Sequence, residues 1–170
     1  STMPNPCLPL DVCIIVGRPI VDFVLEHHPS KSRRVTPEEA VAVVEAAHKR
    51  GHVSHAFFKE AVLGRYYAIC NCCSCCCGAM QAHREGIPML ASSGYVAVLE
   101  KEHCVGCGLC AKKCPFSAIK AREAAPGKPA PCIDSERCLG CGICALHCPG
   151  QALRLVRDPA KPAPLAPEVE

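Results

Sequence analysis

The clearest periodic pattern of apolar and polar positions lies between Thr36 and Arg50. Apolar side chains recur there at spacings of three and four residues, which predicts an amphipathic helix. Thr36 is placed to cap this helix, Pro37 suits its first position, and Glu39 completes a capping box. Gly51 follows the last turn as the residue that ends the helix. The apolar stripe consists of Ala40, Val43, Val44 and Ala47.

Other segments have patterns typical of strands, so we expect an α+β fold. Residues 13–17 form a short apolar run that predicts a buried strand or turn, and residues 95–99 alternate into a strand. Residues 56–67 carry four aromatic side chains and are expected to supply the aromatic packing of the N-terminal half. From residue 157 onward the chain is rich in Pro and Ala, which predicts an extended tail.

The C-terminal half contains two runs with the same cysteine spacing, at residues 104–115 and 138–149. Each reads C-x₂-C-x₂-C-x₃-C-P, which is a bacterial ligand pattern for iron–sulfur clusters. Three closely spaced cysteines can cover one face of a cubane, and the last cysteine of each run then ligates the other cluster. The first predicted ligand set is Cys104, Cys107, Cys110 and Cys148. The second is Cys138, Cys141, Cys144 and Cys114.

These runs resemble the bacterial two-[4Fe–4S] ferredoxins, over about residues 98–156. The resemblance implies two cubanes related by a pseudo-twofold axis, each under a short helix, with short strands that pair the ends. It places the helices at about residues 117–121 and 151–153. The chain departs from the compact ferredoxin pattern between the two runs, where we expect a longer surface loop. Cys132 lies in this segment and has no place in the ligand count.

A third concentration of cysteine lies at residues 70–77, where six thiols occur within eight residues. Packing does not explain such a run, and disulfides between neighbouring cysteines rarely meet the bond geometry. The run is therefore interpreted as a set of soft-metal ligands. Cys70, Cys73 and Cys76 repeat the ferredoxin spacing, while Cys72 and Cys75 offer a second phase.

The N-terminal thiols are predicted to hold at least one additional iron–sulfur cluster. The predicted ligands are Cys70, Cys73 and Cys76, with Cys13 as the fourth because the apolar residues 14–16 are expected to bury it. Cys7, Cys13 and the six cysteines of residues 70–77 together give eight thiols. Eight thiols are enough for one cubane with spares, two cubanes or one larger cluster. A zinc site and a disordered thiol cluster remain alternatives, although the usual pair of separated C-x₂-C knuckles is missing.

The order of motifs in the N-terminal half also resembles a group of anaerobe-type iron–sulfur proteins. The motifs are R-R-V-T-x-E-E-A, G-H-V-x-H and I-C-N-C-C-S-C-C-C, followed by the two ferredoxin-type runs. The group carries an upstream C-x-C-R segment that this sequence lacks, so we expect the chain to be a piece of a longer protein. His48, His52 and His55 lie near these motifs, and a structural role is favoured over metal ligation.

Composition and charge narrow the classes of function. The chain has 170 residues, 17 cysteines and a formal charge of +3. Two resting cubanes with their thiolates would bring the charge to about −1, so net charge does not support nucleic-acid binding. We find in the sequence no membrane-spanning stretch, no signal peptide, no G-x-G-x-x-G fingerprint and no P-loop. Iron–sulfur thiolates need a reducing compartment, so we expect a cytoplasmic protein.

Together these observations predict an iron–sulfur electron-transfer protein of anaerobic metabolism. The expected organisation is a cysteine-rich α+β region at residues 1–97, a ferredoxin module at 98–156 and a tail at 157–170. The clusters would pass single electrons between a donor and an acceptor protein, within a larger complex or alone. The alternatives are a reductase whose N-terminal cluster is the substrate site and a protein of cluster storage or assembly.

Overall fold

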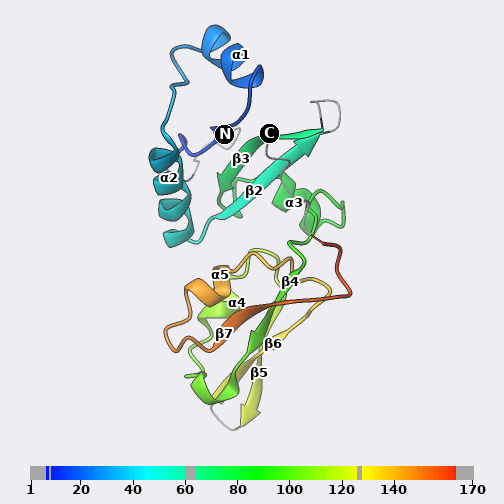
Figure 1. The fold of residues 1–170 in the computed structure, drawn as a ribbon. Helices are drawn as coiled ribbons and strands as arrows, with labels where there is room; N and C mark the ends of the chain where they lie inside the picture. Colours follow the sequence, from blue (N-terminus) through cyan, green and yellow to red (C-terminus); the bar gives the residue numbers. More distant parts are fainter. Residues whose placement is uncertain (1–6, 8, 60–63, 126–127, 164–170) are drawn as a thin grey trace. The chain divides into compact units, whose positions relative to one another are not determined.

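The computed structural model describes residues 7, 9–59, 64–125 and 128–163 (Figure 1). It divides the chain into two compact units, with the boundary between Cys76 and Cys77. The sequence predicts a boundary after residue 97, whereas the structure joins the segment from Cys77 onward to the ferredoxin-type runs. Helices and strands occur in both units, so the α+β class is confirmed. No helix within the described residues is long and apolar enough to cross a membrane.

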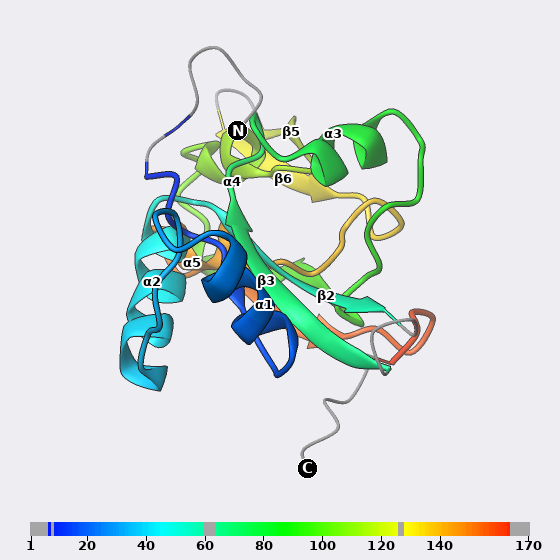
Figure 2. The same cartoon turned by 90° about the horizontal axis from the view of Figure 1, so that it is seen from above.

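The first unit is built on a three-stranded antiparallel sheet in the order β1–β3–β2. The strands are β1 (Ile14–Ile15), β2 (Val53–Lys59) and β3 (Arg65–Cys72). Figure 2 shows β2 and β3 running side by side. The strand predicted at residues 13–17 is present as β1, and two helices precede β2: α1 (Ile20–His27) and α2 (Pro37–Lys49).

Helix α2 has the ends that its sequence predicts. The hydroxyl of Thr36 accepts a hydrogen bond from the backbone N–H of Glu39, at 3.2 Å, and the carboxylate of Glu39 accepts one from the N–H of Thr36, at 2.8 Å. This reciprocal pair satisfies donors that the first helical turn leaves free. Gly51 follows the helix with a φ of +83°, a left-handed conformation that favours glycine. The capping box and the stop signal are both confirmed.

The aromatic side chains of β2 and β3 form two cross-strand pairs. The ring centroids of Phe57 and Tyr67 are 6.3 Å apart, and those of Phe58 and Tyr66 are 5.6 Å apart. The pairing of the two strands is irregular at this point: Phe57 lies opposite Ala68 and Phe58 opposite Tyr66, so Tyr67 is an extra residue on β3. The aromatic packing expected within residues 56–67 is therefore present.

The second unit contains two antiparallel strand pairs and short helices. Strand β4 (Tyr95–Leu99) pairs with β7 (Leu153–Arg157), and β5 (Ile119–Ala125) pairs with β6 (Lys128–Ile133). The strand predicted at residues 95–99 is confirmed as β4. The remaining elements are α3 (Gly78–Arg84), the 3₁₀ helix η1 (Lys101–His103), α4 (Leu109–Lys113) and α5 (Ile143–Leu146).

The helices implied by the ferredoxin resemblance lie elsewhere, and the expected surface loop is a hairpin. Segments 117–121 and 151–153 are not helical, because Ser117 and Gln151 adopt φ values of +53° and +51° and the chain then enters strands. The helices are α4 and α5, which start within the cysteine runs. Between the runs, β5 and β6 pair up to Ala125 and Lys128. The sequence predicts a tail from residue 157, of which residues 164–170 lie outside the described part of the chain.

The core of the second unit lies between the strand pairs and the cysteine runs. Buried side chains from β4, β5 and β7 pack together with two thiols of the second run. These two thiols are therefore part of the hydrophobic core of the unit. The buried members are Val96, Ala97, Ala118, Ile119, Cys138, Cys144 and Leu153.

Candidate metal centres

The two ferredoxin-type runs have the same local backbone, which explains how one sequence pattern builds two matching sites. Gly106 and Gly140 occupy equivalent positions, and each has a φ of +69°. Gly108 and Gly142 are also equivalent, and both are left-handed N-caps, of α4 and α5. The glycines allow the chain to turn tightly between cysteines, a conformation that side chains with a Cβ rarely adopt.

The last cysteine of each run is held in the same way. The Sγ atom of Cys114 accepts a hydrogen bond from the backbone N–H of Ala118 at 3.3 Å, and that of Cys148 accepts one from Ala152 at 3.2 Å. Each hydrogen bond spans a residue with positive φ, Ser117 in the first run and Gln151 in the second. Such bonds orient a sulfur and stabilise its negative charge when it ligates a metal.

The first site (site I) brings together the cysteines that the sequence assigned to the first cluster. Its pocket is lined by Cys104, Cys107 and Cys110 from the first run and by Cys148 from the second. Apolar side chains complete the lining, among them Leu99, Leu109 and Leu153. The crossed contribution of Cys148 follows from the pairing of β4 with β7, which carries the end of the second run back to the first.

The second site (site II) brings together the other predicted set, again with one cysteine from the opposite run. Its lining includes Cys138, Cys141 and Cys144 with Cys114. Phe116, Ile119, Leu139 and Leu155 are among the apolar side chains around them. Both pockets thus present four soft donors in an apolar setting, the donor chemistry that an iron–sulfur cluster requires.

Burial changes the acidity of the thiols in these pockets. It raises the pKa of Cys144 to about 12 and that of Cys141 to about 11, and it also raises the pKa of Cys110. A buried thiolate is costly when no positive charge compensates it. Bound iron supplies that charge, so these thiols fit a metal-cluster site better than a purely structural role.

The two sites differ in their exposure. At site I the Cys107 thiol is exposed, and the neighbouring Val105 side chain is 69% exposed. At site II the Cys138 and Cys144 thiols are buried. Water therefore has closer access to site I than to site II.

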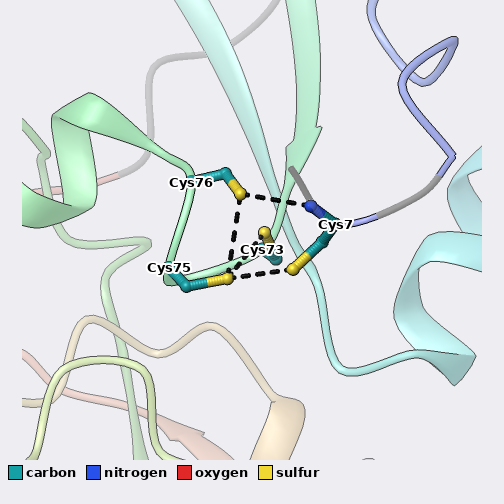
Figure 3. Close-up of side chains that lie close together, drawn as sticks. All are labelled: Cys7, Cys73, Cys75 and Cys76. Atoms are coloured by element: carbon teal, nitrogen blue, oxygen red, sulfur yellow. Dashed lines mark hydrogen bonds between the residues drawn. The ribbon is translucent and has the colours of Figure 1, made fainter. Parts of the chain in front are cut away.

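In the first unit the structure forms a compact group of four thiols, here called the thiol quartet. It consists of Cys7, Cys73, Cys75 and Cys76, whose Sγ atoms all lie within 4.8 Å of one another (Figure 3). The Sγ–Sγ distances are 3.1 Å between Cys7 and Cys75, 3.2 Å between Cys73 and Cys75, and 3.8 Å between Cys75 and Cys76. The backbone N–H of Cys7 donates to the Sγ of Cys76 at 3.4 Å and lowers the pKa of that thiol.

The remaining predicted ligands lie in a separate group. Cys13 and Cys70 have their Sγ atoms 3.9 Å apart, and the neighbouring Cys70 thiol lowers the pKa of Cys13 to about 6. The sequence grouped Cys13 and Cys70 with Cys73 and Cys76, whereas the structure places Cys73 and Cys76 with Cys7 and Cys75. Cys13 is exposed, so the apolar residues 14–16 do not bury it as expected.

A buried asparagine that sequence reasoning missed holds the strands around these thiols. Asn71 is fully buried, and its amide donates to the carbonyl of Val12 at 2.8 Å. Its amide oxygen accepts a hydrogen bond from Ser54 at 2.5 Å, and the Ser54 hydroxyl lies 3.0 Å from Nε2 of His48. The signal in the sequence is an amide between two cysteines of a strand, at a position that alternation places on the opposite face.

The histidines near the N-terminal thiols have structural positions. His48 takes part in the network just described. The Nδ1 of His52 and the Nε2 of His55 are buried and lack hydrogen-bond partners among the described residues, and burial lowers the pKa of both side chains. The quartet contains thiols alone, so the geometry does not bring these histidines into it.

Comparison with known proteins bears on the second unit. The family model of the 4Fe-4S dicluster domain matches residues 103–152, a range that includes all eight cysteines of the two runs. No curated protein and no solved structure matches the chain. The chain therefore carries a C-terminal 4Fe-4S dicluster domain, and a cysteine-rich region precedes it.

Proposed function

We propose that this chain is an electron carrier that passes single electrons through two [4Fe–4S] clusters and a further metal centre in its N-terminal unit. The observation that carries the proposal is the pair of apolar pockets, each lined by three cysteines of one run and one of the other. Spacing, crossed contribution and family match agree on a dicluster site. The ligands proposed for the clusters are those predicted from the sequence.

In this function the protein binds, shields and tunes the clusters. A bound cubane supplies a reversible one-electron couple. Cys114 and Cys148 are oriented by the N–H groups of Ala118 and Ala152, which also spread the negative charge of the sulfurs. Buried Ile119 and Leu153 exclude water from the site II and site I linings, respectively.

The exposure of site I supports a place for electron exchange with partner proteins. Val105 and Cys107 are exposed there, and α4 ends in the exposed side chains of Lys112 and Lys113. Electrons leave most readily where a cluster lies near the surface, and lysines attract a partner of opposite charge. We therefore propose that an acidic redox partner docks beside site I, in a reducing and anaerobic cytoplasm.

An iron–sulfur reductase is the second candidate, because Cys7 and Cys75 are exposed. Exposure would let a small substrate reach a metal bound by the thiol quartet. Electrons from the two clusters would then be consumed within the chain, and not delivered to a partner. Cluster storage or assembly is the third candidate, which transfer of iron to an apo-protein would support.

Anaerobic redox titration of the full chain, followed by electron paramagnetic resonance, tests the proposal. An electron carrier shows one-electron couples whose spectra do not change when small ligands are added. We expect site I to have the higher potential, because water stabilises the more negative reduced state. Cys107→Ala and Cys144→Ala identify the two signals. A preparation with about eight iron and eight sulfide that exchanges no electrons at any accessible potential would contradict an electron-transfer function.

A further inference from the structure

We propose that the thiol quartet of Cys7, Cys73, Cys75 and Cys76 binds a single thiophilic metal ion in a tetrahedral site, and not a cubane. The chemical class of the ligand is a first-row ion that prefers four thiolates, either iron or zinc. This inference deepens the proposed function and rests on its claim that the N-terminal unit holds a metal centre. It assigns that centre its ligands and its nuclearity.

Local structure explains why Cys73, Cys75 and Cys76 converge. Strand β3 ends at Cys72, and the chain then turns, with the N–H of Cys76 donating to the carbonyl of Cys73 at 3.3 Å. The turn is a C-x₂-C knuckle, the form in which many proteins present two thiolates to one ion. Cys75 lies inside the knuckle and adds a third sulfur to the same side.

Contacts of Cys7 itself explain how it becomes the fourth member. Its Sγ atom lies 3.1 Å from the Sγ of Cys75, and its backbone N–H donates to the Sγ of Cys76 at 3.4 Å. Because β1 and β3 are antiparallel, with Ile14 opposite Ile69, the chain before β1 lies at the same end of the sheet as the turn that follows β3.

The sulfur spacing matches one ion. A metal–sulfur bond of about 2.3 Å in a tetrahedral site sets neighbouring sulfurs about 3.8 Å apart. The Sγ–Sγ distances from Cys75 to the other three thiols are 3.1, 3.2 and 3.8 Å, at or below that value, and all four sulfurs fall within 4.8 Å of one another. None of these contacts is near the bond length of a disulfide, which is about 2.05 Å.

The ferredoxin-type cysteines provide an internal comparison. A cubane puts its irons at four corners, so each thiolate binds a different iron and the sulfurs stay apart. Within the described residues, the thiol quartet is the one group of three or more candidate ligands whose donor atoms all lie within 4.8 Å. The two dicluster sites, whose eight cysteines are all described, do not gather their sulfurs in this way. The chain thus distinguishes two kinds of thiolate site.

The negative charge of four neighbouring thiolates also favours a bound metal ion. Four thiolates at such distances repel one another strongly, and exposure at Cys7 and Cys75 only partly relieves the repulsion. A divalent ion at the centre reduces the charge of the site from about −4 to about −2, which one backbone N–H donor further stabilises. Thiolate softness selects zinc or iron over magnesium or calcium.

The test is metal and sulfide analysis of the full chain, purified and reconstituted without oxygen. The variants are Cys7→Ala and Cys75→Ala. Cys132→Ala is the matched control, because Cys132 is an exposed thiol in β6 outside all three thiol sites. Cys13→Ala tests the competing ligand set. The wild-type chain is expected to hold about eight iron and eight sulfide in its clusters and about one further ion.

We expect each quartet variant to lose about one metal ion and no sulfide, while both other variants keep the full content. Loss of about four iron together with about four sulfide would establish a cubane and overturn the proposal. Unchanged metal content in Cys75→Ala, or equal loss in Cys13→Ala, would also overturn it. If sulfide is low in the wild-type chain itself, the dicluster assignment has failed, and not the quartet.

X-ray absorption of the unmodified chain keeps the proposal falsifiable if a variant does not fold. When the further ion is zinc, its edge should show four sulfurs at about 2.3 Å and no metal neighbour. When it is iron, Mössbauer spectroscopy should show one high-spin tetrahedral iron besides the clusters. A zinc edge dominated by nitrogen or oxygen, or iron found in clusters alone with no zinc present, would refute a tetrathiolate ion.

Discussion

Gly140 provides a direct test of how tightly the second cysteine run is packed. Its φ is +69°, and a Cβ built on it would overlap Ser93 Oγ and the carbonyl of Tyr95, whose carbon would lie at 2.8 Å. Ser93 also binds this run, since its N–H donates to the carbonyl of Leu139 and its hydroxyl to that of Gly140, both at 3.0 Å. Gly140→Ala must therefore push the run away from the start of β4.

Gly108 is a control with nearly the same backbone conformation. It has a φ of +70° in the first run, but a Cβ added there would meet nothing within 4 Å. Both substitutions cost about 1–2 kcal/mol for the left-handed backbone. Gly140→Ala adds the cost of overpacking, about 1–3 kcal/mol, because backbone atoms and not a flexible side-chain tip are in the way. We expect a total of about 2–5 kcal/mol for Gly140→Ala and about 1–2 kcal/mol for Gly108→Ala.

The assay is anaerobic cluster release to an iron chelator, followed by loss of cluster absorbance. If release follows local opening, each 1.4 kcal/mol of destabilisation speeds it about tenfold. Gly140→Ala should release iron roughly ten times faster than Gly108→Ala, and from site II first. Equal rates in the two variants would show that the contact between residue 140 and β4 does not limit stability, and would refute the reasoning.

Three further predictions follow from the structure. Thr36→Ala removes the cap of α2 and should destabilise the first unit by about 1 kcal/mol in urea unfolding followed by circular dichroism. Burial lowers the pKa of His52 and His55, so the unfolded chain binds more protons than the folded chain as the pH falls. The stability that is present above about pH 6.5 should therefore be lost as the pH falls through the lowered pKa values of the folded chain. In His55→Gln, the urea midpoint should depend less on pH across that window. A fragment of residues 77–163 should take up about eight sulfides. A 98–156 fragment should take up fewer, because it removes three of the five β4 residues that pair with β7.

The sequence predicts those features that depend on local chemistry. The cap of α2 needs only Thr36 and Glu39, which are close in the chain, and the structure contains both hydrogen bonds. The spacing of each run likewise indicates the three cysteines that it gives to its own pocket, since the turns at Gly106 and Gly140 are local too. The helices that the ferredoxin resemblance implied were placed at the wrong residues. Positive φ at Ser117 and Gln151 stops a helix where the resemblance implied one.

The N-terminal thiols show why spacing alone does not identify a ligand set. The sequence treats Cys70, Cys73 and Cys76 as a loop that wraps a cubane, but Cys70 lies within β3 and is paired with His55 of β2. A strand rises about 3.3 Å per residue, so Cys70 is carried away from the turn that begins after Cys72, and its backbone is committed to the sheet. In each ferredoxin run the first two cysteines lie on a glycine-containing loop and the third lies in the short helix that follows, Cys110 in α4 and Cys144 in α5, so no strand separates them. In the first unit, the same spacing is divided between a strand and a turn. Which thiols meet then depends on where the segment before β1 meets the turn after β3, a long-range contact that cysteine spacing does not contain.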